Sequence, residues 1–148
     1  MPSFDEDFFN SKGKPITYKG NTLIRHDEFP VAKKGKIVVV IESTNSEWKQ
    51  GIGLRTDKSL LIKGYKKVTD IAIWDKVKNR PIEIFYESKN NKILVWNIWD
   101  SKRSGGINFW LNGSAMIVEE LPNGRRYKCN DAHPDDNFDD IIFRIERC

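Results

Sequence analysis

Two groups of residues in this sequence carry side chains that could do chemistry, and the first is an acidic stretch near the C-terminal end. Residues 131–140, DAHPDDNFDD, hold five Asp and one His but no Lys or Arg. Closely spaced carboxylates supply the oxygen ligands that Ca²⁺ prefers. We therefore expect a candidate site for a divalent cation such as Ca²⁺, formed by Asp131, His133, Asp135 and Asp136.

The same stretch also has structural interpretations that need no metal. It is not an EF-hand loop, because it has neither a Gly at the sixth position nor a Glu at the twelfth. Asp side chains form Asx-turns, and Pro134 favours a loop that leads into the last strand. Ion pairs with the nearby Arg125, Arg126 and Lys128 are a further alternative.

Five residues of this stretch, Ala132–Asp136, resemble the AHPDD motif of zinc-dependent N-acetylglucosaminyl deacetylases. The resemblance implies that Asp135 is a general base and that His133 and Asp136 bind a zinc ion that activates water. In that family the motif follows the first strand of an α/β fold, and an acidic residue usually comes next. Here it lies near the C-terminus of a strand-rich chain, and Asn137 comes next. We therefore assign the chain to no family.

The second group of residues is aromatic. The five tryptophans are Trp48, Trp74, Trp96, Trp99 and Trp110. An indole offers a flat apolar face and one N–H donor, which suits stacking on sugar rings, bases or peptide side chains. We expect at least three of the five to be structural. Trp96 and Trp110, together with Asn108, are the predicted binding platform.

Signatures of common enzyme classes are missing from the sequence. It contains no G-x-S-x-G elbow and no P-loop, and Gly51-Ile52-Gly53 lacks the third glycine of a dinucleotide-binding motif. We therefore expect a non-catalytic binding module that recognises a small molecule, a glycan or a protein through an aromatic-bearing sheet face and loops. The alternatives are an intracellular immunity- or antitoxin-type interaction domain and a metal-dependent hydrolase that uses the Asp-rich stretch.

Length and composition predict one globular domain. The chain has 148 residues, of which 39% are hydrophobic and 31% charged, and this composition excludes a disordered chain of low hydrophobicity. The longest apolar run, Ile37–Ile41, has five residues, far short of the roughly 18 that a membrane-spanning helix needs. We expect no membrane association and a single domain over 1–148, with residues 1–12 as a loose N-terminal arm.

Charge and cysteine content indicate which binding partners and which cellular compartment to expect. The net charge is +4, and because 131–140 carry −5, the other residues carry +9 and could favour an anionic partner. The basic residues are scattered and match no nucleic-acid-binding module, so we expect no nucleic-acid partner. Two cysteines, Cys129 and Cys148, are too few for a disulfide scaffold. With no secretory signal at the N-terminus, we expect a cytoplasmic protein with reduced thiols.

Short runs rich in β-branched and aromatic residues, each ended by Gly, Asn, Asp or Pro, predict the fold. The expected strands are 16–18, 22–26, 37–43, 50–55, 59–63, 67–74, 81–87, 93–99, 106–111, 114–121, 125–129 and 138–146. Many short strands at close spacing predict an all-β, antiparallel β-sandwich of jelly-roll type, with a closed β-barrel as the alternative.

Three turn signals predict the register of neighbouring strands. Asn112-Gly113 and Asn123-Gly124 suit type I′ hairpin turns, and Gly20-Asn21 suits a type II′ turn. The two Asn-Gly pairs together predict a three-stranded meander over 106–129, with Trp110 on the outer face. The residues expected on its core face are Ile107, Phe109, Met116, Val118 and Cys129.

Two further expectations concern the centre of the chain. Residues 81–87 and 93–99 are predicted to pair as a hairpin, with Ile84 and Tyr86 on the same face as Val95 and Asn97. Asn97 lies among large apolar residues in the run LVWNIW. A buried amide without a partner costs about 1–3 kcal/mol, so we expect Asn97 to hydrogen-bond a neighbouring loop.

Overall fold

The computed structural model describes residues 3–100, 107–109, 114–131 and 137–148, and its strands are antiparallel, which confirms the all-β class. The only α-helix among the described residues is α1 (Asp5–Asn10), and η1 (Asp75–Val77) is a single 3₁₀ turn. Six residues are far fewer than the ~20 that a helix needs to span a bilayer. The strands are β1 (Ile16–Tyr18), β2 (Asn21–Leu23), β3 (Asp27–Pro30), β4 (Lys34–Thr44), β5 (Lys49–Leu61), β6 (Val68–Trp74), β7 (Ile82–Glu87), β8 (Lys92–Asp100), β9 (Ala115–Leu121), β10 (Gly124–Asn130) and β11 (Ile141–Arg147).

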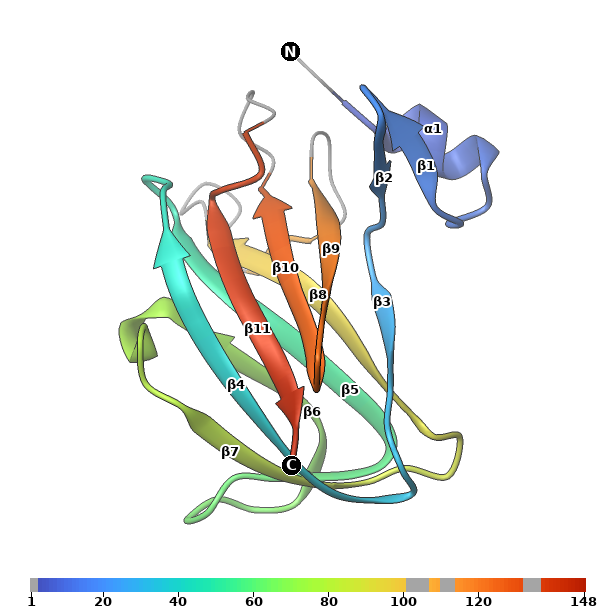
Figure 1. The fold of residues 1–148 in the computed structure, drawn as a ribbon. Coiled ribbons are helices and arrows are strands. Elements are labelled where there is room, and N and C mark those ends of the chain that lie inside the picture. The colour runs from blue at the N-terminus through green and yellow to red at the C-terminus, as the bar shows by residue number, and fades with distance from the viewer. Residues whose placement is uncertain (1–2, 101–106, 110–113, 132–136) are drawn as a thin grey trace.

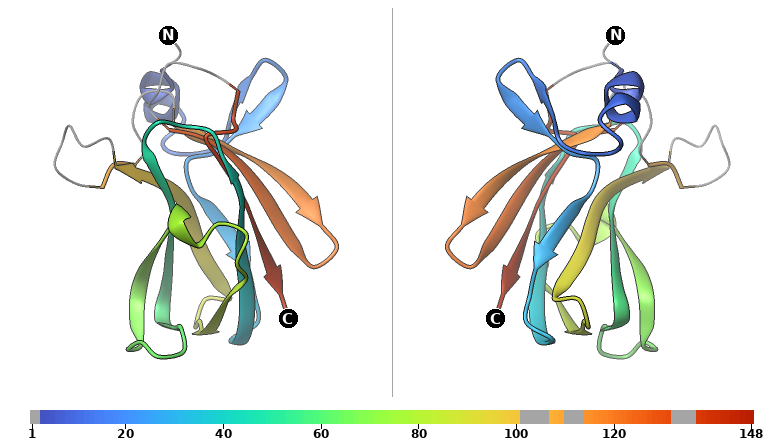
Figure 2. Two further views of the ribbon diagram at one scale, coloured as in Figure 1. Left: turned by 90° about the vertical axis from the view of Figure 1, so that its left-hand side faces the viewer. Right: turned by 90° about the vertical axis from the view of Figure 1, so that its right-hand side faces the viewer.

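One sheet holds all strands except the β1–β2 hairpin. Its order is β3-β8-β5-β7-β4-β11-β10-β9, and β6 pairs with β5 away from this path. The sheet bends round on itself rather than lying flat (Figures 1 and 2). Ile24, which lies between β2 and β3, forms an isolated bridge with Met116 of β9, in which the two residues exchange backbone hydrogen bonds at 3.1 and 2.7 Å.

Side chains also link β3 with β10. Asp27 of β3 accepts hydrogen bonds from the hydroxyl of Tyr127 at 2.5 Å and from Arg125 Nη1 at 2.8 Å. Burial, followed by the charge of Asp27, raises the pKa of Tyr127 far above its ordinary value. The hydroxyl therefore stays protonated and remains a donor to Asp27.

Strand β5 forms the corner where the sheet bends. Its first half, Lys49–Arg55, pairs with β8, whereas Ser59–Leu61 pairs with β7. An irregularity between Arg55 and Leu60 separates the two halves. The segments expected as separate strands, 50–55 and 59–63, thus belong to one bent strand. Because β5 lies between β7 and β8, the predicted hairpin of 81–87 with 93–99 is wrong, although Ile84, Tyr86, Val95 and Asn97 are all buried.

Alternating apolar residues of the sheet form the main core. Strand β11 contributes Ile141, Phe143 and Ile145, and the Phe143 ring stacks on Tyr127 with centroids 4.9 Å apart. A smaller second cluster lies at the N-terminal end, with members Phe4, Phe8, Leu23, Ala115 and Phe138. The expected loose arm is therefore corrected: residues 5–10 form α1, because burying Phe4 and Phe8 holds the segment against the sheet.

Two of the predicted turns occur one residue earlier than expected. The β1–β2 turn is Lys19-Gly20, with φ values of 49° and 82°, and not Gly20-Asn21. In the β9–β10 hairpin Leu121 pairs with Gly124, so the turn residues are Pro122 and Asn123. Proline cannot take the positive φ of a type I′ turn, but it favours the first central position of a type I turn.

The earlier turn moves the β9–β10 register by two residues. Cys129 pairs with Met116 instead of Val118. Because side chains alternate with a period of two, this shift leaves each residue on its predicted face. Met116 and Cys129 are fully buried, as expected, and burial raises the pKa of the Cys129 thiol. Cys129 and the exposed Cys148 are both free thiols.

The third strand expected in this meander is not found among the described residues of 106–111. Ile107 and Phe109 were predicted in the core, yet they are 53% and 42% exposed. Asn108 exchanges backbone hydrogen bonds with Trp99 of β8 instead of pairing with β9. The edge of β9 at Met116 is already taken by Ile24. The predicted turn Asn112-Gly113 lies outside the described residues.

The outer face of β4, β11, β10 and β9 is covered by a network of paired charges. Glu42 lies at its centre, accepting hydrogen bonds from Arg126 at 2.7 and 3.1 Å and from Arg144 at 2.7 Å. The hydrogen bond from Arg126 is the main cause that lowers the pKa of Glu42, and partial burial opposes it. This face therefore stabilises the sheet and offers little free charge to a ligand.

The lowered pKa of Glu42 predicts a pH-dependent stability difference. Glu42→Gln should lower the free energy of unfolding at pH 7 by about 1 kcal/mol. A lowered folded pKa stabilises the fold above the ordinary value of 4.5, and that contribution is lost as the pH falls through the folded value. Urea unfolding from pH 7 to pH 2.5 should show the gap between wild type and variant closing on acidification. The exposed carboxylate of Glu6, changed to Gln, is the control, and a gap that persists at low pH would contradict the assignment.

Candidate functional site

The outer face of β6, β5 and β8 carries an aromatic surface rather than paired charges. Strand register places Trp96 of β8 beside Gly53 of β5, and Gly53 beside Ala72 of β6. Two residues earlier on β5, Gly51 lies between Trp74 of β6 and Ile98 of β8. Two indoles thus flank a pair of glycines on one face of the sheet.

The absence of side chains on the two glycines is what lets the indoles lie close to the sheet. A Cβ on Gly53 would come within 2.3 Å of Trp96 Cε2 and 2.6 Å of its Nε1. A Cβ on Gly51 would come within 2.9 Å of Trp74 Cε3 and 2.8 Å of a backbone oxygen. Neither glycine has a positive φ, so their role here is close approach and not backbone freedom.

Exposed apolar side chains extend this surface beyond the strands. The Phe109 ring lies 6.4 Å from the Trp96 ring between centroids, tilted by 56°. Phe109 and Ile107 are two of the few large hydrophobic side chains with substantial exposure among the described residues. Such exposed apolar side chains grouped together are typical of binding surfaces. We call Trp74, Trp96 and Phe109, with Gly51 and Gly53 between the indoles, the aromatic face.

The rim of the aromatic face is polar. Arg55 of β5 forms an ion pair with Asp70 of β6 at one end. At the other end the ammonium group of Lys49 lies 4.5 Å from the centre of the Trp74 ring, in cation–π geometry. An apolar centre with charged groups at its edges can stack on a ring and also hydrogen-bond the hydroxyl groups around that ring.

The predicted platform residues have different outcomes in the structure. Trp96 is partly buried and pairs with Gly53 on the outer face of the sheet, and its role as a platform residue stays a prediction. The backbone N–H and C=O of Asn108 are bonded to Trp99 of β8, which is itself buried. Trp110 lies outside the described residues. Sequence reasoning overlooked Gly51 and Gly53, although two glycines within a strand are a recognised signal of close approach.

Of the four predicted metal ligands, the structure describes only Asp131. Its carboxylate is buried and accepts hydrogen bonds from Ser46 Oγ at 2.7 Å and from Gln50 Nε2 at 2.8 Å. Its backbone N–H donates to Asp140 Oδ2 at 2.9 Å. His133, Asp135 and Asp136 lie outside the described residues, so the metal site stays a prediction. Within residues 3–100, 107–109, 114–131 and 137–148, no group of three His, Cys, Asp or Glu is arranged to hold a metal ion.

Buried polar groups next to Asp131 hold the start and the end of the acidic stretch. The side-chain amide of Asn97 donates to the backbone oxygen of Asn130 at 2.8 Å. The predicted hydrogen bond of Asn97 is therefore present, but its partner is the last residue of β10 and not a loop. Asn130 Oδ1 accepts a hydrogen bond from the backbone of Phe138 at 2.7 Å. The described ends of the stretch are therefore fixed by internal hydrogen bonds.

The chain was compared with protein-family models, with curated proteins and with solved structures, and none of the three comparisons returned a match.

Proposed function

We propose that the protein is a non-catalytic binding module that holds its ligand on the aromatic face. The observation that carries this proposal is the register that sets Trp96 over Gly53 and beside the exposed Phe109. Apolar rings that lie close to a sheet and border solvent can stack on the flat, C–H-rich face of a pyranose ring. The ligand class proposed here is accordingly a glycan.

The contrast between the two outer faces of the sheet supports this assignment. On the β4–β11–β10–β9 side the charged groups are bonded to one another around Glu42. On the β6–β5–β8 side, charged groups stand at the rim while the centre is apolar. A ligand that buries the centre therefore displaces water from apolar surface and leaves the charged rim able to bond sugar hydroxyls.

Phe109→Ala tests the proposal without disturbing the core, because Phe109 is 42% exposed. Soluble oligosaccharides of glucose, mannose, xylose and N-acetylglucosamine units are titrated, with Trp fluorescence and calorimetry as readouts. For any oligosaccharide that binds, the variant should raise Kd about tenfold, which is the order of effect of losing one stacking ring.

The matched control is Phe85→Ala on β7, since Phe85 is a similarly exposed ring, at 46%, away from the aromatic face. It should leave Kd unchanged. If no member of the panel binds, or if both Phe variants weaken binding equally, the glycan-binding proposal is wrong.

Within the all-β class, we propose the barrel alternative in place of the jelly-roll sandwich. The paired hydrogen bonds of Ile24 with Met116 support it, because they join the two ends of the sheet path. The contacts of Asp27 with Tyr127 and Arg125 support it at the same junction. A sheet joined in this way offers fewer unpaired backbone groups to other chains.

A further inference from the structure

Strand β6 has one open edge. It pairs with β5 on one side and, within the described residues, with no strand on the other. In an antiparallel pair every second residue directs its N–H and C=O away from the partner strand. Among the described residues, the β6 backbone makes no hydrogen bond outside its ladder with β5. The free edge is therefore a row of backbone donors and acceptors with which another strand can pair.

The sequence of β6 does not protect this edge. Lysine and proline within an edge strand are common devices against pairing with another chain. Strand β6, VTDIAIW, contains neither, and its one charged residue, Asp70, is paired with Arg55. The edge of β9 differs, because Ile24 is already bonded to Met116 there. The open edge of β6 is thus available to a partner.

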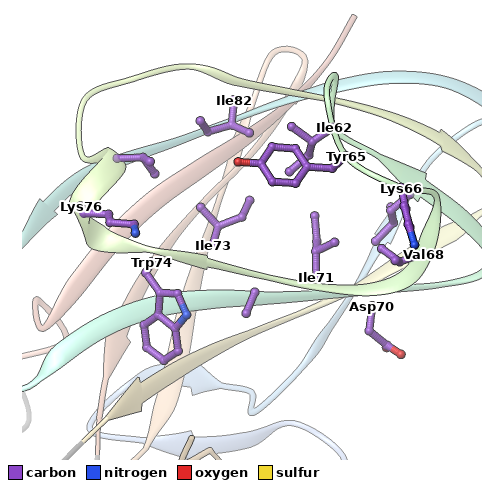
Figure 3. Close-up of a pocket in the computed structure, with 13 residues that line it drawn as sticks. Ile62, Tyr65, Lys66, Val68, Asp70, Ile71, Ile73, Trp74, Lys76 and Ile82 are labelled. Atoms are coloured by element: carbon purple, nitrogen blue, oxygen red, sulfur yellow. The ribbon is translucent and has the colours of Figure 1, made fainter.

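A cavity of about 600 Å³ lies beside β6, between this strand and β7 (Figure 3). Ile71 and Ile73 extend from β6 into it, and Ile82 lies across from them. Asp70 and Trp74 also line the cavity, so it adjoins the aromatic face. In a strand added to β6, every second side chain would point in the same direction as Ile71 and Ile73. Aliphatic side chains at those positions would cover the cavity and become buried.

Unpaired lysines lie at the two ends of the cavity. Lys66 precedes β6 and Lys76 follows it, and Figure 3 shows them at opposite ends. Neither forms an ion pair within the described part of the chain. The seven residues of β6 between them span roughly 23 Å, at about 3.3 Å per residue. One small anion cannot meet both lysines, whereas an extended chain with an acid at each end can.

From these observations we infer that β6 binds an extended segment of a partner protein by strand addition to its free edge. The segment carries aliphatic side chains at every second position and an acidic residue at each end. A polypeptide backbone repeats donors and acceptors at the spacing of a strand edge, and the two acids match Lys66 and Lys76 in charge and separation. The inference does not rest on the proposed glycan binding, although Trp74 borders both sites.

The experiment is a titration of the full chain with the synthetic peptide EVTVTVTVE, acetylated and amidated at its ends, followed by calorimetry and by hydrogen–deuterium exchange. The peptide should bind, and alternate amides of β6 should exchange at least tenfold more slowly in the complex, because the added strand supplies their acceptors. The peptide EVTVPVTVE should bind at least tenfold more weakly, because its central proline cannot donate to a strand edge.

Charge reversal tests the two ends of the segment. Lys66→Glu/Lys76→Glu should weaken the binding of EVTVTVTVE about tenfold and strengthen that of KVTVTVTVK, because opposite charges then face each other again. Lys14→Glu/Lys89→Glu, which reverses two exposed lysines outside the cavity lining, is the matched control and should change neither affinity.

Ile71→Trp tests the cavity. The larger side chain should fill the space that the aliphatic side chains of the peptide need and abolish binding. Because Ile71 is only partly buried, the fold should persist, as checked by circular dichroism and thermal unfolding.

Four results would overturn the inference. They are an absence of EVTVTVTVE binding, equal binding of the proline peptide, unchanged exchange of the β6 amides in the complex, and a dimer in sedimentation without peptide whose β6 amides are already protected. The last result would assign the edge to a second copy of the chain. Phe109→Ala should leave peptide binding intact, so strand addition and glycan binding can fail independently.

Discussion

Replacing Gly124 with Ala is expected to destabilise the protein by about 3 kcal/mol or more, enough to lower its thermal midpoint markedly. A Cβ at this position would lie 1.9 Å from the backbone oxygen of Ile145 and 2.8 Å from Cα of Glu146. Both atoms belong to the backbone of β11, which pairs with β10 at this point. A side chain could rotate away, but a paired backbone can move only if the ladder breaks.

Urea unfolding monitored by circular dichroism measures the effect. Gly64→Ala is the matched control, because Gly64 has a φ of 92° but open space around its Cα. That control should cost about 1 kcal/mol from backbone strain alone. Comparison of the two separates the cost of lost space from the cost of lost conformational freedom. A Gly124→Ala protein as stable as wild type would mean that β10 and β11 can move apart at this point.

Asp131→Ala is expected to cost about 2–4 kcal/mol, because it removes a buried acceptor and leaves its donors unpaired. Gln50 is fully buried, and its amide nitrogen donates to Asp131 at 2.8 Å, while Ser46 Oγ donates at 2.7 Å. Water cannot readily replace the lost carboxylate at a buried position. The donors belong to β5 and to the loop before it, so the change should loosen the attachment of the acidic stretch to β5.

The measurement is the free energy of unfolding in EDTA and again in Ca²⁺. If Asp131 is structural, the loss will be the same in both solutions. A loss that appears only in Ca²⁺ would contradict the structural assignment and favour the predicted metal site. Glu28→Ala, which breaks the exposed pair of Glu28 with Lys92, is the control and should cost under about 1 kcal/mol.

Strand β6 borders both the aromatic face and a cavity of about 600 Å³. Its residue Trp74 belongs to the aromatic face and also lines the cavity, together with Ile71 and Ile73. This is the consequence of a strand that is paired on one side only, among the described residues, and whose two faces therefore both border accessible space.

The sequence by itself determined the class of fold and much of the burial pattern. Runs rich in β-branched and aromatic residues predicted strands at 37–43 and 138–146, and the structure contains β4 and β11 there. Residues of β9 and β10 lie on their predicted faces of the sheet even though the predicted register was wrong. A two-residue shift of register next to Asn123-Gly124 preserves the alternation of side chains. The sequence also predicted that Asn97 forms a hydrogen bond, because a buried amide in an apolar strand needs a partner.

Only the tertiary structure decided which strands are neighbours and where open space remains. The insertion of β5 between β7 and β8, the pairing of Ile24 with Met116, and the exposure of Phe109 all depend on segments far apart in the chain. The same is true of the space around Gly124, which is limited by the backbone of β11 and not by its own φ. Side-chain alternation is a local property of each strand, whereas pairing and cavities arise from contacts between strands, which the spacing of residues along one strand does not encode.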